Sequence, residues 1–303
     1  MLSKELIVKD FKRNKLIYLM VVPMVVYLLI FCYYPMYGAI IAFKNFSPAR
    51  GILGSPWVGL KNFKDFFGSY YFWRLLQNTF FISFWSIVFG FPAPIILALI
   101  LNEVRGKVFK RVCQTVSYLP YFISLVVICG LIRNFCSEQG IINQLSVLLG
   151  GESGNLLSRP EDFRAIYVGS GIWQGIGWGS IIYLAAISGV DLELYDAATI
   201  DGAGRFRQIM HITIPCILPT IIILFLLNIG NILNVGFEKI ILLYNPGTYS
   251  TADVISSFTY RRGLLENNFS YSTAVGLFNS VVNFIFLLTA NTVSNRLSET
   301  SLW

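Results

Sequence analysis

Six long apolar stretches determine what this chain of 303 residues can fold into. A helix needs about 20 consecutive, mostly apolar residues to cross the hydrocarbon core of a bilayer. Each stretch is long enough, so we predict an all-α, polytopic membrane protein with six transmembrane helices. The predicted spans are Leu16–Phe43, Trp73–Leu101, Thr115–Phe135, Ala165–Val190, Ile214–Phe237 and Tyr271–Asn295.

Composition supports lipid, and not water, as the main solvent. The chain is 55% hydrophobic and only 13% charged, whereas soluble domains are about 25% charged. Its net charge of +7 could suggest a nucleic-acid ligand. However, the lysines and arginines lie at the ends of apolar runs and not among aromatic residues, an arrangement typical of contacts with anionic lipid headgroups. We therefore expect membrane lipid as a partner and no nucleic acid.

Basic residues predict the orientation of the spans, because positive charge in short flanking segments resists translocation. They precede the first span and fill the short link between the second and third spans, and we expect both segments to be cytoplasmic. We predict a cytoplasmic N-terminal segment at 1–15, a transmembrane domain at 16–295 and a cytoplasmic tail at 296–303. The basic residues are Lys4, Lys9, Lys12, Arg13 and Lys15, then Arg105, Lys107, Lys110 and Arg111.

A polar segment at 191–213 separates the fourth and fifth predicted spans and should also be cytoplasmic. Asp191 can cap a short helix, and Gly202 permits a backbone with positive φ. We expect a second short helix at 203–210, with Pro215 at a tolerated position near the start of the next span. On physical grounds alone, the segment is either an interfacial loop whose charges face water or a rigid surface for a partner.

The spacing within this segment favours the partner surface. Asp196-Ala197-Ala198, then Gly202, then Ile212-Thr213-Ile214-Pro215 resemble the EAA motif of permease subunits of bacterial ABC importers, with Asp in place of Glu and Ile in place of Leu. In that family the motif forms coupling helices that insert into a cytoplasmic ATPase. The resemblance implies a coupling site made of Asp196, Ala197, Ala198, Asp201, Gly202, Phe206, Ile212 and Pro215.

Further segments resemble permeases of oligosaccharide importers related to aldouronate and rhamnogalacturonan-fragment uptake. They are PMYGAIIAFKNF (35–46), WVGLKNF (57–63), RVCQTVSYLPYFIS (111–124) and NRLSETSLW (295–303). The resemblance implies the type I importer permease fold and oligosaccharide import by alternating access. It also implies a second homologous permease in a heterodimer, two cytoplasmic ABC ATPases and an extracellular solute-binding lipoprotein.

We expect no cofactor in this chain. The sequence lacks the GxxxxGK[ST] phosphate-binding loop, and the resemblance implies that ATP and Mg²⁺ are bound by the partner ATPase. We likewise expect no metal site and no catalytic residues, because the single histidine, His211, has no second histidine or cysteine with which to form a metal site and lies within the 191–213 segment.

A sugar pathway needs hydrogen-bonding amides and aromatic faces. Asn228, Asn231 and Asn234 recur every three residues in the fifth predicted span, and Asn279 and Asn283 are one turn apart in the sixth, so each set should share a helix face. Trp173 and Gln174 could add a stacking surface. The alternatives are amides that bridge neighbouring helices and tryptophans that anchor at the membrane interface.

Two other functions remain open at this stage. An ion-coupled secondary transporter of a polar solute would need acidic residues within the membrane, and the spans contain few. A membrane-embedded enzyme would need convergent catalytic side chains, and a single histidine does not supply a Ser-His-Asp arrangement in any convincing place.

Overall fold

The computed structural model describes residues 13–298. Within this range the chain forms helices and connecting turns, and its only strand-like pairing is an isolated antiparallel bridge between Lys44 and Trp57. The predicted all-α class is confirmed. Most of the predicted segments at 1–15 and 296–303 lies outside the described residues.

The described residues form two compact units. The first contains 13–67 and 262–277, and the second contains 68–261 and 278–298. The first unit begins with a long apolar helical stretch that changes from α to π to 3₁₀ geometry along its length, with Pro23 inside its first part and Pro35 near the change to 3₁₀. Its parts are α2 (Lys15–Tyr27), η1 (Leu28–Tyr33), α3 (Tyr34–Met36) and η2 (Tyr37–Phe43).

The loop that follows this stretch is held by aromatic stacking and by hydrogen bonds to the backbone. The rings of Phe43 and Trp57 stack with centroids 5.7 Å apart, and the Asn62 side chain donates to the Ala42 carbonyl over 2.8 Å. The remaining elements of this unit are α4 (Gly51–Gly54), α5 (Lys61–Phe67), most of η6 (Arg261–Leu265) and the first turns of α18 (Phe269–Ser298).

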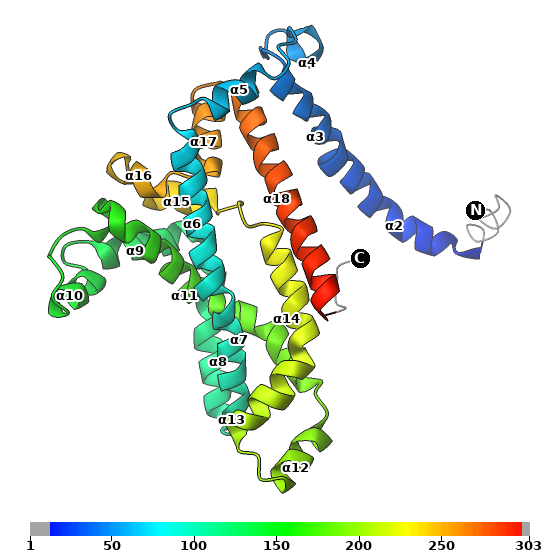
Figure 1. Ribbon diagram of the computed structural model, residues 1–303, viewed down its shortest axis with the longest axis vertical. Coiled ribbons are helices and arrows are strands. Elements are labelled where there is room, and N and C mark those ends of the chain that lie inside the picture. Colours follow the sequence, from blue (N-terminus) through cyan, green and yellow to red (C-terminus); the bar gives the residue numbers. More distant parts are fainter. Residues whose placement is uncertain (1–12, 299–303) are drawn as a thin grey trace. The chain divides into compact units, whose positions relative to one another are not determined.

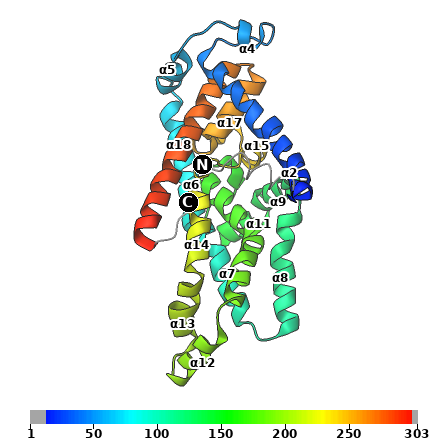
Figure 2. The same cartoon turned by 90° about the vertical axis from the view of Figure 1, so that its right-hand side faces the viewer.

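The second unit is arranged around α11, a helix of 29 residues that packs against α6, α7, α8 and α14 (Figures 1 and 2). Its first helices are α6 (Phe72–Gly90), α7 (Pro92–Glu103), α8 (Lys107–Phe122), α9 (Leu125–Cys136), α10 (Ile141–Leu148), η3 (Leu156–Ser158) and α11 (Pro160–Ser188). They are followed by α12 (Leu192–Ile200), α13 (Arg205–Gln208), η4 (Ile209–Thr213), α14 (Ile214–Ile229), α15 (Phe237–Leu243), η5 (Pro246–Thr248), α16 (Tyr249–Ala252) and α17 (Ile255–Tyr260).

Glycines on α11 allow neighbouring helices to approach closely. A Cβ at Gly177 would lie 2.0 Å from the Ser117 carbonyl oxygen of α8, and a Cβ at Gly179 would lie 3.0 Å from the Pro94 ring of α7. A Cβ at Gly175, one turn before Gly179, would meet nothing within 4 Å. Two sides of α11 therefore pack closely on neighbouring helices, at Gly177 and at Gly179, and open space lies beside Gly175, as is common where small residues line membrane helices.

Within the described range, five helical stretches are long and apolar enough to cross a membrane, or six if a pair bent by 72° counts as one. That pair is α11 with α12. The predicted third span at 115–135 is wrong as one helix, because the chain is extended at Ile123 and Ser124 between α8 and α9. Ser124 caps α9 there by accepting a hydrogen bond from the Val127 N–H, a competing interaction that a hydropathy count does not register.

The predicted fifth span at 214–237 also differs from the structure. The helical stretch begins earlier, at Arg205, and runs through α13 and η4 into α14 without a break. It ends at Ile229, after which residues 230–236 form turns and a short segment without regular secondary structure. The expected independent helix at 203–210 is therefore the first part of this stretch, and the wide π turn of η4 lies just before Pro215, whose ring nitrogen cannot donate a hydrogen bond.

Candidate functional site: the 191–213 segment and the central cavity

The 191–213 segment is a capped helix followed by a sharp reversal. The Asp191 carboxylate accepts a hydrogen bond from the Glu193 N–H over 3.0 Å and caps α12, as predicted. At the other end, the Gly202 N–H donates to the Thr199 carbonyl and the Ala203 N–H donates to the Ala198 carbonyl. These two bonds, with Gly202 at φ +74°, form a Schellman motif, which favours glycine at that position.

Side-chain contacts hold the segment together and tie it to α7. The Tyr195 hydroxyl and the Thr213 hydroxyl are 2.9 Å apart, and the Gln208 amide donates to the Thr199 hydroxyl over 2.9 Å. Arg205 forms an ion pair of 2.7 Å with Glu103 at the end of α7. The segment lies at one end of the second unit (Figures 1 and 2). The two hydrogen bonds hold α12 against the α13–η4 stretch, the ion pair connects the segment to α7, and η4 continues directly into α14.

Apolar side chains of this segment are exposed. Phe206 is 77% exposed, and Leu192 and Ile200, which sequence reasoning did not select, are 74% and 87% exposed. Such side chains on a capped, polar-edged helix are typical of a surface that a partner covers. Of the predicted coupling residues, Ala198 and Ile212 are half-buried, whereas Asp196, Ala197, Asp201, Gly202, Phe206 and Pro215 are exposed.

The predicted amide residues form a cluster that joins the turn after α14 to α18. The side-chain oxygen of Asn234 accepts hydrogen bonds from the side chains of Asn279 over 2.9 Å and Asn283 over 3.1 Å. Its side-chain nitrogen donates to the side-chain oxygen of Asn231. Asn283 in turn accepts from the Leu233 N–H. The expectation of one helix face for Asn228, Asn231 and Asn234 is wrong, because α14 ends at Ile229; the contacts favour the alternative of amides that bridge chain segments.

A central cavity of about 470 Å³ lies among α6, α7, α11, α14 and α15 in the second unit. Two of the predicted pathway residues, Gln174 and Asn228, line it, whereas Trp173 lines two other cavities beside α8 and α9. Gly171, Gly175 and Gly179 of α11, each one turn from the next, also line it, and a Cβ at Gly175 would meet only open space. Other lining residues include Ser86, Gly90, Pro94, Tyr167, Tyr183 and Lys239.

Lys239 is the charged residue of the central cavity, and sequence reasoning missed it. It is 7% exposed, its ammonium donates to the Tyr167 carbonyl over 3.2 Å, and it lies 4.9 Å from the centre of the Tyr167 ring. Burial lowers the pKa of Lys239 to about 8, so the ammonium form still predominates at pH 7. A single lysine just after an apolar stretch resembles an interfacial lysine in sequence, so only the fold reveals its burial.

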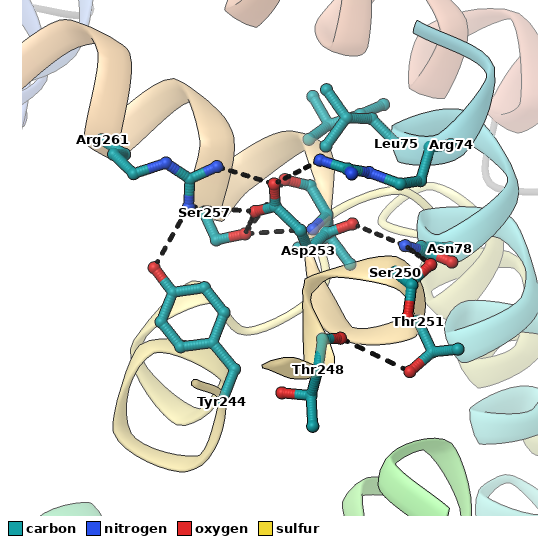
Figure 3. Close-up of polar contacts among 12 residues, drawn as sticks. Arg74, Leu75, Asn78, Tyr244, Thr248, Ser250, Thr251, Asp253, Ser257 and Arg261 are labelled. Atoms are coloured by element: carbon teal, nitrogen blue, oxygen red, sulfur yellow. Dashed lines mark hydrogen bonds and ion pairs between the residues drawn. The ribbon is translucent and has the colours of Figure 1, made fainter. Parts of the chain in front are cut away.

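A second buried charge lies outside the cavity, at Asp253 (Figure 3). Its carboxylate is 2.6 Å from Arg261 and 3.7 Å from Arg74, and it accepts a hydrogen bond from Ser257. The Asn78 side chain donates to the Asp253 carbonyl, which fixes the 249–261 region against α6. Burial acts to lower the pKa of Arg261, but the hydrogen bonds and charge of Asp253 outweigh it and the pKa is raised.

The residues the structure describes, 13–298, contain no group of three His, Cys, Asp or Glu side chains arranged to hold a metal ion. The charged and polar groups at the two sites are instead suited to binding a protein surface and a polar solute. The 191–213 segment supplies the exposed apolar surface, and the central cavity supplies amides, tyrosines and one ammonium group.

Comparison with known proteins identifies relatives of the whole chain. Residues 90–299 match the family described as binding-protein-dependent transport system inner membrane component. The polygalacturonan/rhamnogalacturonan transport system permease protein YteP of Bacillus subtilis (strain 168) is 44% identical over 301 residues, which cover 99% of this chain and 94% of YteP.

Two solved structures share the fold. One is a crystal structure of a bacterial ABC transporter involved in the import of the acidic polysaccharide alginate; its matching chain is 45% identical, with a TM-score of 0.88, over 96% of this chain and 99% of that chain. The other is a bacterial alginate ABC transporter in complex with an alginate pentasaccharide-bound periplasmic protein, 44% identical with a TM-score of 0.88, over 97% of this chain and 99% of that chain. The predicted importer permease fold is confirmed.

Proposed function

Because the chain belongs to the family of binding-protein-dependent transport system inner membrane components, we propose that it is the permease subunit of an ATP-driven importer of oligosaccharides. It is a multi-pass membrane protein, and we place both termini in the cytoplasm on the basis of the basic residues that flank the first spans. YteP is named as a polygalacturonan/rhamnogalacturonan transport system permease, and the alginate transporter was solved with a periplasmic protein that binds an alginate pentasaccharide, which supports an oligosaccharide as the solute.

The observation that carries this proposal is the direct connection between the 191–213 segment and the walls of the central cavity. α11 leads into α12, and α13 continues through η4 into α14. The Arg205–Glu103 ion pair connects the segment to α7 as well. All three of these long helices line the cavity, so a force applied to the segment would move three cavity walls together, which is what alternating access requires.

The partners that we propose follow from the exposed surfaces. Two cytoplasmic ABC ATPases bind ATP and Mg²⁺ and hydrolyse ATP, and one receives the exposed apolar side chains of the 191–213 segment. A second, homologous permease completes a heterodimer; the lack of any buried residue in α2 supports a neighbour of this kind or lipid along that helix. An extracellular solute-binding lipoprotein delivers the sugar, in line with the periplasmic protein of the alginate complex.

The ion-coupled alternative finds no support among the relatives, which belong to ABC transport systems. The charged residues described here also argue against it. Asp253 is held by two arginines, and no acidic side chain lines the central cavity, so the cavity has no carboxylate to carry a proton or a sodium ion.

Uptake into proteoliposomes tests the proposal. We expect the chain, assembled with its second permease and ATPases, to take up labelled oligosaccharide only when ATP and Mg²⁺ are inside and the binding protein is outside. Ionophores that collapse proton and sodium gradients should leave the rate unchanged. Vesicles that lack this chain are the control, and gradient-driven uptake without ATP would contradict the proposal.

A further inference from the structure

Lys239 is a buried cation without an anionic partner among residues 13–298. The ion pairs of this part of the chain do not include it, and the central cavity that it lines contains no aspartate or glutamate. The Tyr167 carbonyl and ring supply its polar contacts within the chain. An isolated buried charge costs several kcal/mol, so a structural role alone would be met better by an apolar side chain.

Glycines of α11 leave unfilled space in the cavity on the side of the Lys239 ammonium. A Cβ at Gly171 would lie 3.5 Å from the Lys239 nitrogen, and a Cβ at Gly175, one turn further along α11, would meet nothing within 4 Å. Glycine at 171 leaves room beside the charge, and glycine at 175 leaves open space in the same cavity that a larger side chain would fill. The cavity volume of about 470 Å³ falls in the range of small-ligand sites.

The other lining groups suit a sugar. Gln174 and Asn228 offer amides for hydroxyl groups, and Tyr183 and Tyr167 offer aromatic surface. A neutral sugar would use these groups but would leave the ammonium unneutralised. A carboxylate on the sugar ring would accept a charge-assisted hydrogen bond from the ammonium and would offset its burial.

We propose that Lys239 binds a carboxylate of the transported solute and is the residue of this subunit that selects for uronate groups. The proposal rests on the proposed function, since it assigns a specificity-determining residue to the solute site of the same transporter. It gives this subunit a role in recognising charge, in addition to any selection by the binding protein.

Three variants of the assembled importer test this role, each with the same binding protein, so that delivery is constant. Lys239→Met removes the charge but keeps an unbranched side chain, Lys239→Arg keeps the charge, and Lys64→Met alters an exposed lysine of α5 as a control. ATP-driven uptake is measured with the uronate trisaccharides trigalacturonate and trimannuronate and with neutral arabinotriose and maltotriose. The melting temperature of each purified complex is recorded.

We expect Lys239→Met to slow uptake of the uronate trisaccharide about tenfold or more, because a hydrogen bond to a charged group contributes about 1.5–3 kcal/mol. Lys239→Arg and Lys64→Met should retain most of the rate. The melting temperature of Lys239→Met should not fall, because methionine removes an unpaired buried charge. Gly175→Leu, which fills open space in the same cavity, should also slow uptake.

Unchanged uptake by Lys239→Met would overturn the inference. So would equal losses in Lys239→Met and Lys239→Arg together with lowered melting temperatures, because that pattern indicates a structural role. If the wild type carries neutral trisaccharides but neither uronate, the inference fails and the proposed function stands. If ATP drives uptake of none of the four sugars and hydrolysis does not respond to them, the proposed function itself fails.

Discussion

We expect Gly202→Pro to reduce the substrate-stimulated ATP hydrolysis of the assembled importer to its unstimulated rate. Gly202 has φ +74° and donates its N–H to the Thr199 carbonyl. Proline fixes φ near −65° and has no N–H, so the substitution removes the reversal between α12 and α13. The measurement is ATP hydrolysis in proteoliposomes with and without the sugar-loaded binding protein.

Gly204→Pro is the matched control for this experiment. Gly204 has φ −69°, close to the angle that proline requires. Its N–H donates no hydrogen bond among the described residues, so proline should leave the segment intact and the stimulation close to wild type. Equal stimulation in wild type and Gly202→Pro would show that the geometry of the 191–213 segment does not transmit the signal.

The second large effect is expected at the buried ion pair of Asp253 (Figure 3). Asp253→Ala leaves Arg261 and Arg74 without their carboxylate, and breaking a buried pair by removing one partner costs about 3–5 kcal/mol. We therefore expect a melting temperature lowered by roughly 10 °C, given about 2–4 °C per kcal/mol for chains of 150–250 residues. The measurement is thermal unfolding of the purified permease in detergent.

An exposed ion pair provides the control. Glu266 is exposed and pairs with Arg262, and exposed pairs contribute about 0–1 kcal/mol. Glu266→Ala should therefore shift the melting temperature by only a few degrees. If Asp253→Ala lowered it no more than Glu266→Ala does, the buried pair would not be what holds the 249–261 region against α6.

The elements that could be predicted from the sequence are those whose signal is local. Apolar length placed the spans that correspond to α2–η2, α6–α7 and α18, because a run of about 20 apolar residues is a property of the segment itself. The cap at Asp191 and the positive φ at Gly202 were also predicted, since each depends on a side chain and its nearest backbone neighbours.

The features that could not be predicted depend on contacts between distant segments or on small competing interactions. A cap at Ser124 divides the predicted third span, and the fifth helical stretch ends at Ile229 although the predicted span continued to Phe237. The spacing of Asn228, Asn231 and Asn234 predicted a shared helix face. In the structure the Asn234 side chain instead accepts hydrogen bonds from Asn279 and Asn283, which are 45 and 49 residues away in the sequence. Lys239 and Asp253 differ from surface charges only in their burial.

The coupling role of Asp196, Phe206 and their neighbours stays a prediction, and a photo-cross-link tests it most directly. With p-benzoylphenylalanine in place of Phe206, which is 77% exposed, irradiation of the assembled importer should give an adduct with an ATPase subunit. The control position is Tyr70, which is 86% exposed and precedes α6 in the link between the first and second predicted spans. A cytoplasmic N-terminal segment before the first span puts this link on the extracellular side, so no ATPase adduct should form there. An ATPase adduct from Tyr70 but none from Phe206 would place the 191–213 segment on the wrong side of the membrane for the proposed importer.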